Sequence, residues 1–569
     1  MRWPVGVSDD LSYKRGVKGW RWTLVEGTAQ ELPPSLLDDP ERFLCKHPPQ
    51  KVLKESPVRT VSIISGPRGR LFLKRYKIKK FKEKFKYLAV PSKAHKEWLM
   101  GRQALRKGIP TPMPLAIAER RKGIFLQDAF LITQAIFPSS SFIELILDGR
   151  HKDLLSPAAR LIHQIHEAGL FHQDLHAGNI LVGENNNKLY LIDLHRSRFV
   201  KSVSQRRKLW NLAQFFYSLK GLISNKNKKV FLNRYDKEGK TFNKGFEETL
   251  RRIERVEERI YRRHMKSRTK RCLKDSGGFY VAKDDSWRIW ARRGWEFQTL
   301  LQLIKKHKKI VDKGTDGLIK TDRRSAISLF NYRKTRICVK EYRYRGGLGC
   351  IKDCFRRSRA RRGWLMGNGL VVRGVPGITP QALLERRVRG FLKDAFLIME
   401  TPPGYVELDR YMVRSFEGFP HKKLKARTFL MALAGFIAHL YTLRISHRDL
   451  KACNIMVREE HVGWEFGLVD MDDIRLDKNI RTRRFVKALI QLHTSTPLFI
   501  GMDDRIAFLS EYLRLIGRGD IREIISAVSR GSRGRQLVYV DPQGDVIMDV
   551  AWEKTCASCC EPALSKEDL

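Results

Sequence analysis

The 569-residue sequence predicts an α+β fold in which two bilobal domains follow one another, each with a small β-rich N-lobe and a helical C-lobe. Three observations carry this prediction: a long internal repeat, a short polar phrase present once in each copy, and the same order of strand-like and helix-like segments in both. Because 42% of the residues are apolar, the chain can bury more than one core.

The internal repeat runs through most of the chain. Lys51–Lys77 aligns with Gly317–Arg343 at a constant offset of 266 residues, and the same offset pairs Trp98 with Trp364. A repeat of this length predicts two copies of one folding unit. We expect the boundary in the charged helical stretch that follows Thr249, and the predicted parts are a first domain, a second domain and a C-terminal tail at residues 1–262, 263–545 and 546–569.

Within the first copy the elements follow a definite order. Alternating β-rich segments come first, then a helix that ends before Gly108–Pro112, then the strand-like AFLIT. A second helix is expected to open at Ser156–Pro157, with an N-cap and a proline in its first turn, and to stop at Gly169. Gly277–Trp295 is expected to form the opening strands of the second copy, as Gly19–Glu26 does in the first.

A short polar phrase follows the second helix in each copy. It reads HQDLHAGNIL from His172 in the first copy and HRDLKACNIM from His447 in the second. Each copy supplies an Asp, an Asn five positions later, and a second Asp 19 or 21 residues after the first. One copy could arise by chance, but two in matched context favour a site for phosphoryl transfer.

Phosphoryl transfer of the kinase type requires this set of groups. One carboxylate orients the acceptor hydroxyl, while an Asn and an Asp hold Mg²⁺ on the ATP phosphates. The sequence therefore predicts ATP and Mg²⁺ as cofactors, with catalytic residues Asp174 and Asp449 and metal ligands Asn179, Asp193, Asn454 and Asp470.

Further residues are candidates for nucleotide binding. Lys74 and Lys340 lie on short apolar strands about 100 residues before the phrase, where a kinase places the lysine that pairs with the α/β-phosphates. Glu97 is either the helix-borne partner of Lys74 or an exposed helical carboxylate. The turn SGPRGR is expected to bring backbone N–H groups near phosphate. The second copy lacks this glycine turn and has glycine in place of the helix acid, so the first copy is better equipped to bind ATP; the glycines concerned are Gly66, Gly69 and Gly363.

The charge balance is strongly basic. Lys+Arg is 111 and Asp+Glu is 61, which leaves +50, and the basic residues gather in runs such as Lys74–Lys86, Arg262–Lys274 and Arg356–Arg362. This excess favours a polyanionic partner: nucleic acid, a phosphorylated glycan or an anionic membrane face. Nucleic-acid binding alone would explain the charge but not the repeated Asp–Asn–Asp set.

The sequence lacks recognisable export signals, and we therefore expect a cytoplasmic protein. The N-terminus lacks the apolar core of a signal peptide, and the longest apolar stretch, Phe429–Leu443, is interrupted by His439 and short for a membrane span. Nine cysteines without regular pairing agree with a reducing compartment. The C-terminal cluster is read as an ordinary thiol-bearing tail, with palmitoylation or metal binding as alternatives; it comprises Cys556, Cys559 and Cys560.

These motifs resemble the bacterial lipopolysaccharide kinases, which phosphorylate Kdo or heptose in the inner core. The resemblance lies in GLFHQDLHAGNILV (Gly169–Val182), LYLIDLHRSRF (Leu189–Phe199) and SRTKRCLKDSGGF (Ser267–Phe279), together with the GIPTP turn. It implies a protein-kinase-like fold, Mg-ATP, a sugar hydroxyl as acceptor and a position at the cytoplasmic face of the inner membrane. The +50 charge suits an anionic glycolipid acceptor and an anionic inner-membrane surface.

Two other functions stay open at this point, as does the oligomeric state. A protein kinase is one of them, because HRDLK in the second copy is closer to the catalytic-loop motif of protein kinases. Against it, no APE-like sequence follows Asp193. A pseudokinase scaffold that binds an anionic membrane or glycolipid would explain the charge, but the retained set of Lys74, Asp174, Asn179 and Asp193 argues against it.

Overall fold

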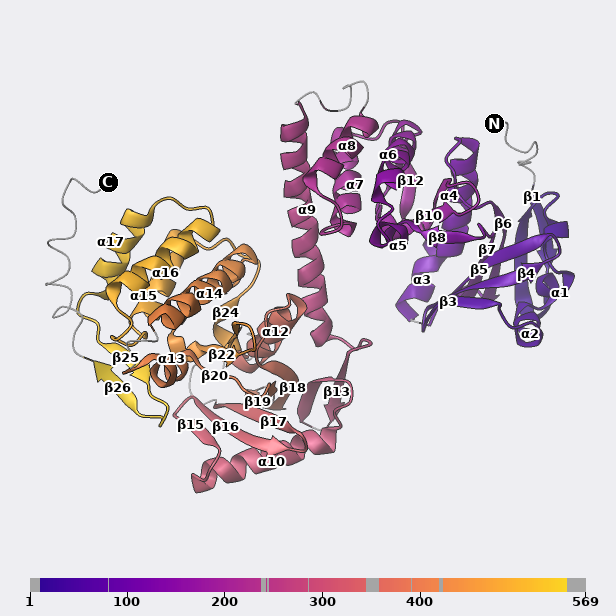
Figure 1. The fold of residues 1–569 in the computed structure, drawn as a ribbon. Helices are drawn as coiled ribbons and strands as arrows, with labels where there is room; N and C mark the ends of the chain where they lie inside the picture. Colours follow the sequence, from indigo (N-terminus) through magenta and orange to yellow (C-terminus); the bar gives the residue numbers. More distant parts are fainter. Residues whose placement is uncertain are drawn as a thin grey trace. The chain divides into compact units, whose positions relative to one another are not determined.

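The computed structural model describes residues 11–79, 81–236, 242, 245–284, 286–343, 358–389, 391–418 and 423–549. The chain divides into two compact units, unit one (Met1–Tyr261) and unit two (Arg262–Leu569), and the division falls within helix α9 (Gly245–Thr269). Each unit combines a sheet lobe with a helical lobe, so the predicted α+β, bilobal fold is confirmed (Figure 1). The predicted cluster of Cys556, Cys559 and Cys560 lies outside the described residues.

The sheet lobe of unit one is a seven-stranded antiparallel sheet. On β2 the residues Trp20, Trp22 and Leu24 alternate with more exposed neighbours and pack into one core. This period of two is what a half-buried strand requires. In spatial order the strands are β1 (Leu11–Arg15), β2 (Trp20–Val25), β6 (Pro114–Lys122), β7 (Phe125–Gln134), β5 (Gly69–Lys77), β4 (Arg59–Gly66) and β3 (Lys51–Ser56).

Helices cover both faces of this sheet. Helices α1 (Pro34–Asp38) and α2 (Pro40–Lys46) pack on the face that carries Trp20 and Trp22. Helix α4 (Lys93–Arg106) lies on the other face, where its buried Trp98 joins a cluster with residues of β5 and β7. The Ser92 hydroxyl caps α4 by accepting from the His95 N–H, as expected at a helix N-terminus. Helix α3 (Phe81–Ala89) precedes α4.

The helical lobe of unit one surrounds short strand pairs that carry the polar phrase. Helix α6 begins at His151, earlier than the predicted Ser156, so that Pro157 lies inside the helix rather than in its first turn. Two antiparallel pairings, β9 with β12 and β10 with β11, place the phrase beside the second acidic segment. The elements are α5 (Phe142–Leu147), α6 (His151–Glu167), α7 (Gln205–Ser218), α8 (Asn225–Tyr235), β8 (Ser139–Ser141), β9 (Leu170–His172), β10 (Ile180–Gly183), β11 (Leu189–Leu191) and β12 (Ser197–Phe199).

Unit two repeats the sheet topology of unit one strand for strand. The predicted opening strands are present as β13 and β14 and occupy the edge that β1 and β2 occupy in unit one. The spatial order is β13 (Phe279–Asp284), β14 (Trp287–Arg292), β18 (Thr379–Val388), β19 (Phe391–Thr401), β17 (Thr335–Arg343), β16 (Ser325–Tyr332) and β15 (Leu318–Thr321).

The helices of unit two take equivalent places. Trp364 of α12 is fully buried against the sheet, like Trp98 in unit one, and α10 packs on the opposite face. The remaining elements form the helical lobe and its short strand pairs. The helices are α10 (Phe297–Lys313), α12 (Arg359–Val372), α13 (Leu408–Phe416), α14 (Lys423–Thr442), α15 (Thr482–His493), α16 (Met502–Leu515) and α17 (Ile521–Ser532); the strands are β20 (Val406–Glu407), β21 (Ser446–His447), β22 (Ile455–Glu459), β23 (Trp464–Leu468), β24 (Ile474–Arg475), β25 (Leu537–Val540) and β26 (Val546–Asp549).

The apolar stretch noted in the sequence belongs to α14, whose buried residues join the core of unit two. Among the residues that the structure describes, no helix has both the length and the apolar character needed to cross a membrane.

Candidate active site

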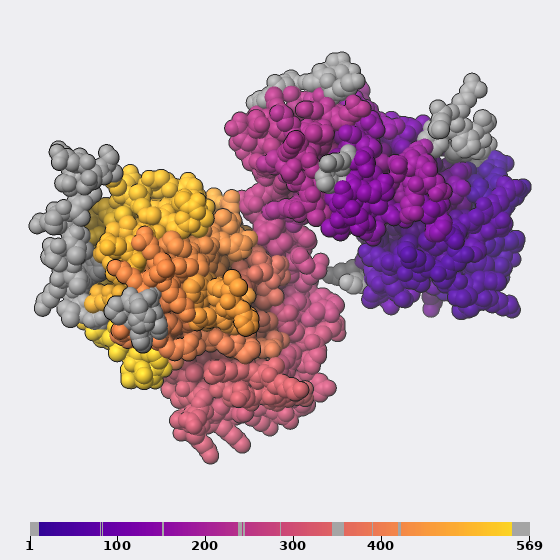
Figure 2. Space-filling view, in the orientation of Figure 1, coloured from indigo at the N-terminus to yellow at the C-terminus, as the bar shows by residue number. Residues whose placement is uncertain are grey.

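A cavity of about 870 Å³ in unit one gathers five of the seven site residues predicted for that unit. In the space-filling view the sheet lobe of this unit is indigo and its helical lobe purple to magenta, and residues of both lobes line the cavity (Figure 2). The sheet lobe contributes a lysine and a glutamate, and the helical lobe contributes two aspartates and an asparagine. They are Lys74, Glu97, Asp174, Asn179 and Asp193.

Lys74 and Glu97 form a buried ion pair. The Lys74 Nζ lies 2.6 Å from Glu97 Oε1, and the Tyr76 hydroxyl donates to the other carboxylate oxygen at 2.8 Å. Glu97 is only 7% exposed, so the alternative of an exposed helical carboxylate is wrong. The pair joins β5 to α4 and holds the ammonium group at the cavity.

Asp193 lies at the meeting point of several charged groups. Its backbone is left-handed (φ 64°), a conformation that non-glycine residues adopt mainly where the surrounding structure enforces it. His195 Nδ1 lies 2.8 Å from Asp193 Oδ1, Arg59 Nη1 3.5 Å and Lys74 Nζ 3.6 Å. Burial alone would raise the pKa of Asp193, but the His195 hydrogen bond and the neighbouring cations lower it well below its usual range.

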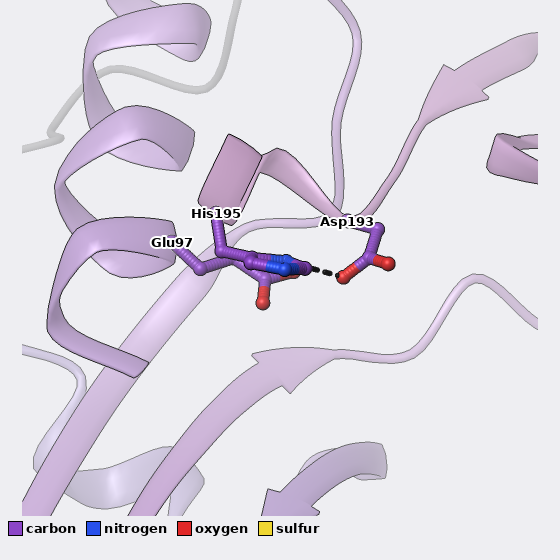
Figure 3. Close-up of side chains that lie close together, drawn as sticks. All are labelled: Glu97, Asp193 and His195. Atoms are coloured by element: carbon purple, nitrogen blue, oxygen red, sulfur yellow. Dashed lines mark hydrogen bonds and ion pairs between the residues drawn. The ribbon is translucent and has the colours of Figure 1, made fainter. Parts of the chain in front are cut away.

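Three side chains form the cluster in unit one whose donor atoms could hold a cation. The ligand atoms of Glu97, Asp193 and His195 all lie within 4.8 Å of one another (Figure 3). In the close-up the side chains of Asp193, which precedes the turn η4 (Leu194–Arg196), and His195, its middle residue, point toward each other. Carboxylate oxygens of this kind suit a divalent cation such as Mg²⁺.

Asp174 and Asn179 are fixed by the hydrogen bonds of their own loop. The Asn179 amide donates to the Asp174 backbone oxygen at 2.8 Å, which leaves its amide oxygen as the atom able to coordinate a cation. The Asp174 N–H donates to Nδ1 of His172, a fully buried ring whose pKa burial lowers to about 4. The Asp174 carboxylate is partly exposed, with Arg196 Nη1 at 3.0 Å. His172 thus acts as a neutral scaffold for the loop.

The prediction for Gly66 and Gly69 is corrected by the strand register. These glycines face each other at the β4–β5 turn, five residues from Lys74, and neither is among the residues that line the cavity. At about 3.3 Å per residue, the turn lies roughly 16 Å along the strand from the lysine. The β3–β4 turn comes closer, because Arg59 pairs with Tyr76, only two residues from Lys74.

The two residues that flank the β3–β4 turn, Ser56 and Arg59, line the cavity, whereas the glycines do not. Arg59 was missed in the sequence, where a single arginine at the start of a strand gives no local signal. Its guanidinium beside Asp193 is the structural evidence for a part in the site.

Unit two brings its predicted residues together differently. The Asn454 amide donates to the Asp449 backbone oxygen at 2.8 Å, as in unit one, and Asp470 again has a left-handed backbone (φ 50°). Lys340, however, contacts both Asp470 and Asp472, the latter at 2.9 Å. Burial and the neighbouring Asp472 raise the pKa of Asp470. Asp472, two residues after Asp470, is only 2% exposed.

The residues present in unit one fit a divalent cation bound to a triphosphate. An ammonium group, a carboxylate held ionised and an amide oxygen converge on one cavity, and these are the donors such a ligand needs. Further cations of the cavity lining add positive potential: Lys51, Lys54, Arg59, Lys93 and Arg196.

Comparison with known proteins gives a consistent result. The family model described as the lipopolysaccharide kinase (Kdo/WaaP) family matches residues 64–235 and again residues 320–512, together more than half of the chain. Two curated relatives are 3-deoxy-D-manno-octulosonic acid kinases. The protein of Xylella fastidiosa (strain M23) is 31% identical over 124 residues, which cover 22% of this chain and 48% of the relative. That of Xanthomonas campestris pv. campestris (strain B100) is 30% identical over 141 residues, 25% of this chain and 55% of the relative.

Other similarities are more distant. A probable serine/threonine-protein kinase BUD32 homolog of Archaeoglobus fulgidus is 26% identical over 158 residues, 27% of this chain and 69% of that protein. The solved structure titled "WaaP in complex with acyl carrier protein" is 22% identical with a TM-score of 0.32, and the match covers 41% of this chain and 98% of that one. The chain spans about half the length of the first curated relatives it matches.

Proposed function

Because the chain belongs to the lipopolysaccharide kinase (Kdo/WaaP) family, we propose that it is an ATP-dependent phosphotransferase acting on a sugar hydroxyl of the lipopolysaccharide inner core, Kdo or heptose. Unit one is the active unit in this proposal. The observation that carries it is the convergence of the Lys74–Glu97 ion pair, Asp174, Asn179 and Asp193 on a single cavity. Curated relatives named as 3-deoxy-D-manno-octulosonic acid kinases support the sugar acceptor.

Each residue then has a defined task. Mg-ATP, when bound, supplies the phosphoryl group. Lys74 neutralises phosphate charge and is kept in place by Glu97, while Asn179 and Asp193 provide the oxygen ligands for Mg²⁺. Asp174 accepts the proton of the attacking hydroxyl and orients it, and its partly exposed carboxylate is accessible to an acceptor. Most of the rate gain comes from positioning and charge stabilisation.

The charges around the cavity support an anionic acceptor. Lys51, Lys54 and Lys93 line it from the sheet lobe, and Arg196 lies 3.0 Å from Asp174. A guanidinium beside the catalytic carboxylate would hold a carboxylate or phosphate group of the acceptor close to the proton acceptor. Inner-core sugars that carry such groups meet this requirement.

We also propose that the protein binds peripherally to the cytoplasmic face of the inner membrane. Helix α3 supports this idea, because Phe81 and Phe85 are 70% and 48% exposed on it while buried Tyr87 fixes the helix to the sheet lobe. Lys79 and Lys86, which are close to these residues in the sequence, are exposed as well. Apolar side chains rimmed by cations suit a surface of anionic lipid headgroups. The helix is followed closely by Lys93 of the cavity lining, so docking there would bring the cavity near a lipid-bound acceptor.

The proposal is tested by phosphate transfer from labelled Mg-ATP to purified inner-core glycolipid and, in parallel, to a generic protein substrate. We expect transfer to the glycolipid, reduced by about 10²–10⁴-fold in Asp174→Asn and little affected in Asp449→Asn. Asp148→Asn, which changes an exposed carboxylate outside the cavity lining, is the matched control. Loss confined to Asp449→Asn would move the active site to unit two, and transfer only to protein would overturn the sugar acceptor.

A further inference from the structure

The strand lysine of unit two receives its carboxylate partner from an unexpected element. In unit one Glu97 of α4 accepts from both Lys74 and Tyr76. In unit two the corresponding lysine and tyrosine contact Asp472, which follows the predicted metal ligand on the turn η8 (Met471–Asp473). Lys340 Nζ lies 2.9 Å and the Tyr342 hydroxyl 3.1 Å from Asp472 Oδ1. The same pair of donors is therefore satisfied by a carboxylate from a different part of the chain.

The space for this substitution is created by a glycine. Gly363 of α12 stands at the position of Glu97, and a Cβ there would lie 3.1 Å from Leu397 Cδ2, 3.2 Å from the Tyr342 hydroxyl oxygen and 3.7 Å from Asp472 Cβ. A glutamate at this position would have to displace these neighbours. Conversely, the residue of unit one that matches Asp472, two positions after the metal-binding aspartate, is His195. The two differences are complementary: the acid missing from the helix is present on the turn.

The link between sheet and helix is also rebuilt, with a different distribution of charges. Arg359, the first residue of α12, donates through Nε and Nη2 to Asp472 Oδ2 at 3.1 and 2.9 Å. In unit one the helix carries the acid and the strand the cation. In unit two strand and helix both carry cations, and Asp472 joins them. The matching residue of unit one is Lys93, which lines the cavity there.

The buried carboxylate of Asp472 has charged partners that compensate for its removal from water. A carboxylate only 2% exposed would be strongly destabilising without charged partners. Burial opposes its ionisation, but Lys340, Arg359 and its hydrogen bonds lower its pKa below the usual value. The neighbouring acid Asp473 differs, since it contacts Arg448 and not the strand lysine.

We propose that Asp472 is the positioning residue of a second nucleotide site: it holds Lys340 and ties α12 to β17 through Arg359, so that unit two binds a Mg-nucleoside triphosphate without a helix glutamate. The inference rests on the proposed nucleotide chemistry of the fold and extends it to unit two. It does not depend on the acceptor of unit one, which the transfer assay tests separately.

The experiment uses the full chain carrying Lys74→Met and Asp193→Asn, so that nucleotide binding reports unit two. Calorimetry measures the affinity for Mg-ATP and for adenosine. We expect Asp472→Asn to weaken Mg-ATP binding at least tenfold while adenosine binding is unchanged, because the groups that it releases, Lys340 among them, act on the phosphates. Asp473→Asn is the matched control and should leave both affinities unchanged.

A triple variant that carries the residues of unit one, here called the transplant, tests the inference even if Asp472→Asn is poorly folded. Changing Arg359→Lys, Gly363→Glu and Asp472→His together rebuilds the arrangement of unit one and is expected to restore Mg-ATP affinity to within about threefold of the parent. An unchanged affinity in Asp472→Asn, an equal loss for ATP and adenosine, no recovery in the transplant, or no Mg-ATP binding by the parent would each overturn the inference.

Discussion

Glu97 Oε1 lies 2.6 Å from Lys74 Nζ, and this ion pair joins α4 to β5 at the cavity of unit one. Both side chains are about one-tenth exposed, and the Tyr76 hydroxyl occupies the second carboxylate oxygen. Removing one partner of such a buried ion pair destabilises the fold, because the other charge is left buried without compensation. Each side chain therefore depends on the other for its position.

The first prediction concerns this pair. Lys74→Met is expected to lower kcat/KM for ATP by about 100-fold and Glu97→Gln by about tenfold, since the first removes the phosphate contact and the second only its positioning. Steady-state kinetics with Mg-ATP provide the measurement. Lys77→Met, on the same strand but outside the cavity lining, serves as the control. Full activity in Lys74→Met would contradict the assignment of the nucleotide lysine.

The second prediction distinguishes the two turns of the sheet. Arg59→Ala should raise KM for ATP about tenfold, because it removes a charged group from the cavity lining beside Asp193. Gly69→Ala should leave KM unchanged and lower the melting temperature, since Gly69 has a φ of 141° that side chains disfavour. The reverse pattern would restore the original prediction that the glycine turn contacts phosphate.

The third prediction concerns α3 and is measured by co-sedimentation with vesicles. Vesicles that contain phosphatidylglycerol are expected to bind the chain and neutral phosphatidylcholine vesicles to bind it weakly. Phe81→Ser with Phe85→Ser should reduce binding at least about tenfold, as two exposed rings no longer enter the lipid surface. Val462→Ser with Leu424→Ser changes two exposed apolar residues of unit two and should have no effect.

A charge series completes the vesicle test. Lys79→Gln with Lys86→Gln should weaken binding and reduce its salt dependence, whereas Lys305→Gln with Lys309→Gln on α10 should change little. Equal losses in both pairs would show that overall charge, rather than α3, drives binding. Activity on a water-soluble acceptor should be the same in all these variants.

The fourth prediction is a loss of stability in mild acid. Burial lowers the pKa of His166 and His172 to about 4, so the unfolded chain binds protons below about pH 6.5 that the folded chain does not. Stability is therefore expected to fall as the pH drops from 6.5 toward 4, by about 2 kcal/mol for each histidine at pH 5. Melting temperatures across this range provide the measurement.

A histidine variant provides the control for this slope. His166→Gln should be less stable at pH 7.5, because the ring contacts Tyr235 and Asn211, but should show a shallower decline with acid. His461→Gln, at an exposed position, should keep the parent slope. A melting temperature that stays constant between pH 7 and pH 5 would contradict the role of the buried rings.

Local motifs account for the parts of the site that the sequence could predict. The geometry of Asp174 and Asn179 is set by hydrogen bonds within a loop of a few residues, so spacing alone indicated it. The strand lysines were found from their position before this loop, and the repeat predicted that unit two would have the sheet of unit one. These features depend on neighbours close in the sequence or on a long repeated pattern.

Other features depend on contacts between distant segments. The lysine and carboxylate of the Lys340–Asp472 pair are 132 residues apart, and nothing in either segment alone indicates the contact. The part played by Arg59, rather than Gly66 and Gly69, follows from the register of β4 against β5. A register shift of one residue reverses every side chain, and sequence patterns do not determine it at a turn.

By itself, the sequence determined that this protein consists of two α+β units of one family, each with an Asp–Asn–Asp set, in a strongly basic chain. Only the tertiary structure decided which groups surround the strand lysines: Glu97 in unit one and Asp472 in unit two. The physical reason is that a buried ammonium group requires a carboxylate close to it in space, and any segment of the chain can supply that carboxylate. Packing of α12 against β17 and η8 places that acid beside Gly363, where a Cβ would lie 3.7 Å from Asp472 Cβ.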